Sequence, residues 1–225
     1  MESILVTKNI NRIFPIVGKE SFQALKDINI EVPKGKLAIL RGRSGSGKTT
    51  LINILGALDN PTSGQVFFNG KEITDISEKE KEMIRRQEVG FIFQSISLIP
   101  NMTAYENVEF ALRLSGYDGD MKARTEECLK QVGLGGRMYH MPQEMSGGEQ
   151  QRVAIARAIA HKPTVIIADE PTAELDTNTA FAVVNLFKEL VEKEKITILM
   201  TTHDVGLMSA GDVVFQLEDG EIVNE

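Results

Sequence analysis

The sequence predicts an α/β protein built around a parallel β-sheet, and two features lead to that prediction. The first is a set of four short, almost uninterrupted apolar runs, at residues 36–42, 89–94, 164–169 and 196–203. Near-continuous hydrophobicity is typical of strands buried on both faces, as in a parallel sheet covered by helices. The second is that helical patterns follow two of the runs, at residues 49–58 and 178–194. Strands alternating with helices favour α/β architecture.

A second kind of strand flanks this core. Residues 4–10, 24–32 and 65–73 carry β-branched and aromatic side chains in partial alternation, which is typical of half-buried strands. Residues 69–70 (Asn-Gly) form a hairpin signal, and residues 218–220 (Glu-Asp-Gly) lie between two further strand-like segments. We therefore expect an N-terminal antiparallel β sub-domain and a hairpin near the end of the chain.

The middle of the chain is expected to be helical. Between residues 95 and 160 no strand pattern is convincing, while two helix starts fit a capping box, one from Thr103 to Glu106 and one from Ser146 to Glu149. The prediction is a single domain over residues 1–225. Its core and antiparallel strands come from residues 1–94 and 161–225, and a helical sub-domain is inserted at 95–160.

Composition narrows the function. A chain of 225 residues with net charge −7 and 42% hydrophobic residues is typical of a globular protein. No apolar run approaches the roughly 20 residues that span a bilayer, and we see no signal-peptide pattern, so no direct membrane insertion is expected. The acidic balance argues against nucleic-acid binding. Cys128, the single cysteine, is expected to be an inert structural thiol in a reducing cytosol, and His140 and His161 are expected to be structural too.

The clearest motif is a phosphate-binding loop at residues 42–49, between a predicted strand and a predicted helix. Its residues are Gly42, Arg43, Ser44, Gly45, Ser46, Gly47, Lys48 and Thr49, which match the pattern G-x-x-x-x-G-K-[ST]. The glycines let backbone N–H groups surround phosphate oxygens at the positive end of the helix. Lys48 is expected to reach the β- and γ-phosphates and the Thr49 hydroxyl to bind Mg²⁺. This predicts a nucleoside triphosphate site.

The other buried runs also end in polar residues, which are Gln94, Asp169 followed by Glu170, and His203. In open α/β sheets, ligands bind beyond the carboxyl ends of the strands. Asp169 suits a ligand of Mg²⁺ or its waters beside Thr49, and Glu170 can orient or deprotonate the attacking water. His203 is predicted to contact the γ-phosphate. The alternatives are an ordinary strand-to-turn junction at Asp169 and a structural histidine at His203.

A second anion site is suggested by Ser146-Gly147-Gly148-Glu149. A capping box explains the serine and the glutamate, but glycine is less favourable than alanine by about 1 kcal/mol inside a helix. Glycines there fit the close approach of a backbone or a ligand, and a free helix start favours an anion. A rigid chain has difficulty closing this site and the phosphate loop on one phosphate. Two copies paired head to tail, as a C₂ homodimer holding two nucleotides, remove the difficulty.

The order of these motifs resembles the ATP-binding cassette ATPases of membrane transporters, over essentially the whole chain. The resemblance implies that residues 42–49, with Thr50, are the Walker A motif, Gln94 is the Q-loop ligand of Mg²⁺, and residues 146–149 are the signature motif. Walker B ends at Asp169 and Glu170, the D-loop contains Asp176, and His203 is the switch histidine. Phe14 lies where the family's adenine-stacking aromatic falls, the alternative being a core phenylalanine. ATP and Mg²⁺ are the implied ligands, with Glu170, His203, Lys48 and Gln94 as catalytic residues.

A closer resemblance is to the small ATPases of lipoprotein-release, macrolide-export and antimicrobial-peptide-resistance transporters. It is carried by residues 44–64, 89–108 and 146–172. It implies a separate integral membrane permease, docked between Gln94 and Thr103, that exports or extracts its substrate. The chain would then lie peripherally on the cytoplasmic face of the plasma membrane, and would be cytosolic when isolated.

The chain departs from the family pattern at three places. Met145 stands for leucine, Glu149 for the glutamine common in the wider superfamily, and Ala173-Glu174 for Gly-Asn or Gly-Ser in the D-loop. The D-loop change puts fine communication across the dimer in doubt, but not ATP binding.

The alternative function is an ATPase of this type that powers a non-transport process such as cell-division control. A soluble repair or translation ATPase fits less well, because those carry two cassettes or added domains.

Overall fold

The computed structural model of the chain describes residues 2–16, 18 and 20–223. Its centre is a six-stranded sheet in the order β11-β10-β4-β9-β8-β7. The strands are β4 (Leu37–Arg41), β7 (Val89–Ile92), β8 (Val165–Ala168), β9 (Thr197–Thr202), β10 (Val213–Glu218) and β11 (Glu221–Val223). The pairs from β10 through β7 are all parallel. The four apolar runs are therefore confirmed as neighbouring strands of one parallel sheet.

The strand at 213–218 has a larger role than its sequence indicated. It forms the expected hairpin with β11, with Glu218 opposite Glu221, but it also pairs in parallel with β4, with Val213 opposite Ala38. Its sequence does not mark it as part of the parallel sheet because β10 lies near the sheet edge, where Val214 stays 42% exposed. Its pattern is consequently half-polar rather than continuously apolar.

A second sheet has five strands, is antiparallel and is formed by the first part of the chain. Its strands are β1 (Ser3–Phe14), β2 (Phe22–Ile28), β3 (Glu31–Pro33), β5 (Ser63–Phe68) and β6 (Lys71–Glu72). The predicted hairpin turn is confirmed, because Asn69 and Gly70 have φ angles of 48° and 78°. The segment at 24–32, predicted as one strand, is interrupted at residues 29–30, and β2 and β3 pair with different halves of β1.

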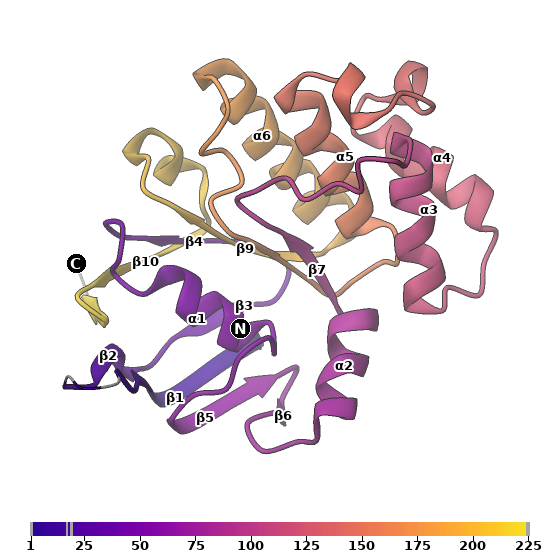
Figure 1. Cartoon of the computed structure of the whole chain (residues 1–225). Coiled ribbons are helices and arrows are strands. Elements are labelled where there is room, and N and C mark those ends of the chain that lie inside the picture. The colour runs from indigo at the N-terminus through magenta and orange to yellow at the C-terminus, as the bar shows by residue number, and fades with distance from the viewer. Residues whose placement is uncertain (1, 17, 19, 224–225) are drawn as a thin grey trace.

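Helices cover both faces of the central sheet, and one of them lies between it and the antiparallel sheet (Figure 1). Figure 1 shows α1 (Lys48–Leu55) between the two sheets, with α6 (Thr177–Glu194) on the opposite side of the central sheet. Between β7 and β8 the described chain holds α3 (Ala104–Ser115), α4 (Met121–Gln131) and α5 (Gly147–Ile159), with the short 3₁₀ turns η1 (Gly135–Arg137) and η2 (Pro142–Glu144), and no strand. The predicted helical insertion is thus confirmed. A further 3₁₀ segment, η3 (Val205–Ala210), follows β9.

One helix was not predicted. Helix α2 (Glu78–Gln87) lies in the strand-rich first part of the chain and begins with a capping box formed by Ser77 and Glu80. That Ser-x-x-Glu pattern is a sequence signature of a helix start, so this helix could have been predicted.

Among the described residues, no helix is long and apolar enough to cross a membrane.

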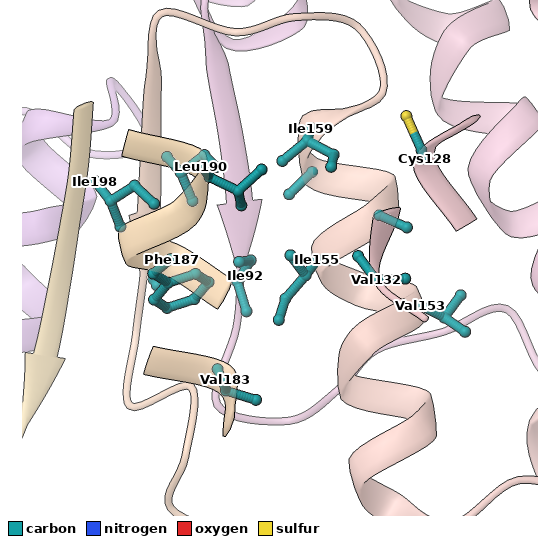
Figure 2. Close-up of a cluster of buried hydrophobic side chains, with 14 of the residues drawn as sticks. Ile92, Cys128, Val132, Val153, Ile155, Ile159, Val183, Phe187, Leu190 and Ile198 are labelled. Atoms are coloured by element: carbon teal, nitrogen blue, oxygen red, sulfur yellow. The ribbon is translucent and has the colours of Figure 1, made fainter. Parts of the chain in front are cut away.

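The hydrophobic core ties the helical layer to the sheet. Figure 2 shows Ile155 and Ile159 of α5 directed toward Ile92 of β7 and Phe187 of α6, within one cluster of buried side chains. Cys128 belongs to the same cluster, on the other side of α5, and is fully buried. Burial raises the pKa of its thiol to about 12, so almost no thiolate exists at neutral pH. This agrees with an inert structural cysteine.

Candidate functional site

The strand ends meet at one edge of the central sheet, where they open a cleft of about 630 Å³. β4 leads into the phosphate loop and α1, β7 into Gln94, β8 into Asp169 and Glu170, and β9 into His203. The cleft is lined by Phe14, Phe22, Ala24, Arg43, Ser44, Gly45, Gly47, Lys48, Thr49, Thr50, Gln94, Glu170 and His203. Residues predicted from four separate segments of the sequence are therefore gathered in one place.

Two glycines allow the phosphate loop its shape. A Cβ on Gly42 would lie 2.3 Å from the Leu217 carbonyl oxygen. Gly47 has a φ of 105°, in the left-handed region, and a Cβ there would lie 2.7 Å from the Ala24 oxygen. Gly47 is also the N-cap of α1 and provides no side-chain cap. The first N–H groups of α1 therefore lack a side-chain partner at the cap, as an anion-binding helix start requires.

Lys48 is held inside the loop. Its Nζ donates to the carbonyl oxygens of Gly42 and Arg43, at 2.9 and 3.2 Å, and lies 3.3 Å from Oε1 of Glu170. Its side chain is buried, with 5% of its surface exposed. A buried cation aimed along a glycine loop is a strong attractor for phosphate oxygens.

Asp169 is fixed by two hydroxyl donors. Thr49 Oγ1 donates to its Oδ2 at 2.9 Å, and Thr201 Oγ1 donates to its Oδ1 at 2.7 Å. The Thr201 hydroxyl in turn accepts the backbone N–H of Glu170 at 2.8 Å. This set fits Mg²⁺, which prefers oxygen ligands and keeps several positions for phosphate and water. Within the described ranges, no group of three or more His, Cys, Asp or Glu side chains gathers as a metal site.

Glu170 stands between two basic side chains. Its Oε1 faces Lys48, and its Oε2 lies 3.0 Å from Nδ1 of His203. The backbone of Glu170 has a φ of 42°, a strained conformation for a residue other than glycine. Such strain tends to occur where function needs a side chain in one direction. At Glu170 it accompanies a carboxylate that faces the phosphate cleft.

The start of α5 lies outside this cleft, and none of Ser146, Gly147, Gly148 and Glu149 is among its lining residues. The predicted capping box is confirmed: the Glu149 N–H donates to Ser146 Oγ at 3.3 Å, and the Ser146 N–H donates to Glu149 Oε2 at 2.9 Å. The two hydrogen bonds from Ser146 lower the pKa of Glu149, the backbone bond more than the hydroxyl bond. Met145, in place of the family's leucine, is buried in the core.

The paired glycines have different surroundings, which revises the reason expected for them. A Cβ on Gly147 would meet nothing within 4 Å, whereas one on Gly148 would lie 2.6 Å from Cγ2 of Thr179. Thr179 also hydrogen bonds through Oγ1 to Asp176, the N-cap of α6. That hydroxyl and the Thr179 N–H lower the pKa of Asp176. Gly148 is thus required by packing within the chain, and only Gly147 leaves open space for a ligand.

The opposite end of the cleft is apolar. Phe14, at the end of β1, lies directly opposite Phe22 of β2 in the antiparallel register. Both rings line the cleft, with Ala24 next to them. The Arg12 guanidinium lies over the Phe14 ring, 4.5 Å from its centre. Phe14 is therefore a cleft residue and not a core one. Phe22 and Ala24 were not predicted from the sequence, because the place of Phe22 depends on the β1–β2 register that sets it opposite Phe14.

The ABC transporter family model matches residues 25–173. The ABC transporter ATP-binding protein YtrE of Bacillus subtilis is 46% identical over 197 residues, covering 87% of this chain and 85% of that protein. The uncharacterized ABC transporter ATP-binding protein MJ0796 of Methanocaldococcus jannaschii is 42% identical, covering 97% of this chain and 94% of that protein. The macrolide export ATP-binding/permease protein MacB of Bartonella henselae is 42% identical over 99% of this chain, which spans only 34% of that longer protein.

Solved structures agree with these relatives. The dimeric structure of MJ0796 superposes with a TM-score of 0.90 at 39% identity, covering 98% of this chain and 97% of that one. A dimeric post-hydrolysis state of MJ0796 bound to ADP and Pi superposes with a TM-score of 0.89. The fold of this chain is thus the fold of dimeric ATP-binding cassettes.

Proposed function

The chain belongs to the ABC transporter family of ATP-binding proteins, and from that premise we propose that it closes head to tail, as a homodimer, on two ATP molecules with Mg²⁺. As a member of that family it is an ATPase, the dimerising subunit that drives a separate permease of a membrane transporter. One observation carries the proposal: the phosphate loop, Lys48 and Glu170 line one cleft, while Ser146 and Gly147 stand exposed outside it.

The second copy completes the site. In the proposed dimer, Ser146 and Gly147 of each copy face the phosphate loop of the other, so that each ATP is bound by both chains. The open space beside Gly147 and the exposed start of α5 support this. Thr179 joins Gly148 to Asp176, so the D-loop would approach the partner together with the signature. ATP then stabilises the closed state through contacts that the open state lacks.

Hydrolysis requires Glu170 to be free to act on water. In the chain alone, the Glu170 carboxylate is paired with Lys48 and His203. A bound triphosphate competes for Lys48, since phosphate oxygens offer the cation more negative charge than one carboxylate. Glu170 then orients and deprotonates the attacking water. His203, which hydrogen bonds to Glu170 at 3.0 Å, would contact the γ-phosphate.

Thr49, Asp169 and Gln94 would hold Mg²⁺. Thr49 and Asp169 already hydrogen bond to each other, at 2.9 Å, and Gln94 lines the same cleft. The bound ion would neutralise charge on the phosphate oxygens during transfer. At the other end of the cleft, Phe14 would stack on the adenine, and Arg43, Ser44, Gly45, Ser46 and Thr50 would surround the phosphates.

The permease would dock between Gln94 and Thr103, with the ATPase held at the cytoplasmic face of the membrane by that contact. This segment is fastened to two helices of the insertion. Arg157 of α5 donates to the Ser97 carbonyl at 2.7 Å, and buried Asn107 of α3 accepts the Ile99 N–H at 2.8 Å. A shift of the segment would therefore move α5, whose other end carries the signature.

We assign the partner to the export type, as in the macrolide relative. The relatives are transporter proteins, so the non-transport alternative is not favoured.

Replacing Glu170 with Gln tests the assignment of the base. The variant should lose hydrolysis by about 100-fold to 10,000-fold, the usual contribution of a general base, yet still dimerise with ATP. Phosphate release and analytical ultracentrifugation measure the two properties. Glu192→Gln, on the exposed surface of α6, is the matched control and should change neither. Normal hydrolysis by Glu170→Gln would show that Glu170 is not the general base.

A further inference from the structure

We propose that Phe22 is a second base-binding residue, which with Phe14 forms an aromatic clamp for the purine ring of the nucleotide. The inference rests on the proposed function, because it assumes that a triphosphate occupies the phosphate loop. It adds a residue whose side chain no motif identified. The proposed ligand of the clamp is the flat heteroaromatic base attached to the triphosphate.

The exposure of Phe22 is the first observation. It is 54% exposed, although it belongs to a strand of the antiparallel sheet and lines the cleft. With Phe14 and Ala24 it forms an apolar part of the cleft lining, and contiguous apolar surface of this kind marks ligand-binding grooves. Ala24, at the register shift of β2 between Gln23 and Leu25, lines the cleft as well.

The position of β2 relative to the phosphate loop is the second observation. The carbonyl of Ala24 lies so close to Gly47 that a Cβ there would be 2.7 Å away. The Lys26 N–H donates to the Gly220 carbonyl at 2.7 Å, and Gly220 N–H donates to the Ser46 carbonyl at 3.2 Å. The strand that carries Phe22 is thus packed directly against the loop that holds the phosphates. Phe22 accordingly lines the same cleft as the loop.

The third observation is the state of the neighbouring ring. Arg12 covers one face of Phe14 and is itself held by Asp59 at 2.9 Å. Only the other face of Phe14 is left for a ligand. Phe22 stands directly across the strand pair from it, and cross-strand neighbours have Cβ atoms about 5 Å apart. Two adjacent aromatic side chains can contact one base together.

The chemistry at this end predicts how the base is bound. Phe14, Phe22 and Ala24 are all apolar, so they contact the faces of the ring and the edge of the sugar rather than reading hydrogen-bond donors. Base–aromatic stacking is tolerant of base identity because every base has a π-face. The contribution of Phe22 should consequently be similar for ATP and GTP and absent for a ligand without a base.

Calorimetric titration of the full chain with Mg-ATP, Mg-GTP and inorganic tripolyphosphate tests the clamp. Phe22→Ala should weaken both nucleotides by about fivefold, at the low end of measured stacking effects, and leave tripolyphosphate unchanged. Phe22→Tyr should bind within about twofold of the parent. Phe110→Ala, which removes a ring that is 37% exposed on α3, is the matched control and should bind all three ligands normally.

The outcomes separate the clamp from the proposed function. Equal ATP affinity in Phe22→Ala and the parent chain would overturn the clamp, and so would an equal loss for tripolyphosphate, which would mean that the loop had moved. If Phe22→Ala unfolded, Phe22→Leu, which keeps the apolar volume, should still lose about threefold for ATP only. A parent chain that binds tripolyphosphate and ATP with equal affinity would overturn the clamp as well. A parent chain that binds neither would contradict the proposed function instead.

Discussion

Two helix starts in this protein carry glycines and serines, and they are built differently. Helix α1 begins at Gly47 without any side-chain cap and without an acidic residue in its first turn. Helix α5 begins at Ser146 with a complete capping box, whose acidic member is Glu149. The first start leaves its N–H groups for a ligand and adds a buried lysine. The second has satisfied part of its own hydrogen bonding and has placed a negative charge at its end.

The difference explains why one site binds phosphate within the chain and the other needs a partner. At α1, cation, glycine loop and helix start converge on one cleft. At α5, a capped and solvent-exposed start has little affinity for an anion by itself. It becomes useful only when a nucleotide already bound elsewhere is brought to it. The weaker site thus suits a contact that must form and break in each cycle.

The largest effect should come from disabling each start in turn. Lys48→Ala should lower hydrolysis by about 100-fold or more and prevent ATP-driven pairing of the variant with itself, because a preorganised cation at the phosphates is lost. Ser146→Arg should leave nucleotide binding to each chain intact and block ATP-driven pairing. A mixture of the two variants restores one composite site, formed by the loop of the Ser146→Arg chain and the signature of the Lys48→Ala chain.

Sedimentation of the mixture measures the result. Pairing with ATP should reappear in the mixture although neither variant pairs alone. As the control, each variant is measured alone with ATP at the same total protein concentration. Absence of pairing in a mixture of folded chains would contradict the sharing of sites between copies.

The two starts also differ in how far they could be predicted from sequence. The α1 site is local: residues 42–49 are contiguous, and its other members stand at strand ends, which the apolar runs located correctly. The surroundings of α5 are not local. Gly148 is explained by Thr179, which is distant in sequence and comes near only when α5 packs beside α6. The same holds for Phe22, whose role depends on the β1–β2 register. The pairing of Lys48 with Glu170 likewise depends on how the strands are arranged in space.

The second effect is on stability and separates the two glycines of α5. Gly148→Ala should destabilise the monomer by about 1 kcal/mol, because the new methyl group overpacks against Thr179. Gly147→Ala meets no neighbour and should be neutral or stabilising by a few tenths of a kcal/mol. Its cost should appear instead as weaker ATP-driven pairing. Urea unfolding and sedimentation measure the two properties.

Thr179→Ser provides the matched partner for Gly148→Ala. The serine removes the Cγ2 atom in close contact and keeps the hydroxyl that bonds to Asp176. The double variant Gly148→Ala with Thr179→Ser should recover most of the stability lost in the single one. No recovery would mean that the glycine is required for a reason other than this contact.

The smallest effect concerns the charge of Glu149. Glu149→Gln keeps an acceptor for the Ser146 N–H but removes a negative charge from the helix start and leaves Arg137, now 3.4 Å from Glu149, without its partner. Both changes favour an anion there, so half-maximal pairing should need about twofold less ATP. The matched control is Glu106→Gln in the capping box of α3, where Glu106 accepts the Thr103 N–H at 2.7 Å. It should leave pairing unchanged.

The pH dependence of unfolding gives an independent check on Glu149. Hydrogen bonds from Ser146 lower its pKa below the ordinary value of 4.5 in the folded chain, so the ionised form stabilises the fold. That contribution is fully present above about pH 4.5 and is lost as the pH falls through the lowered pKa. Parent and Glu149→Gln should therefore differ in urea midpoint at pH 6 and converge toward pH 3. A difference that persists unchanged into acid would show that the charge of Glu149 does not act at this helix start, and the contrast between α1 and α5 would then rest on the cap alone.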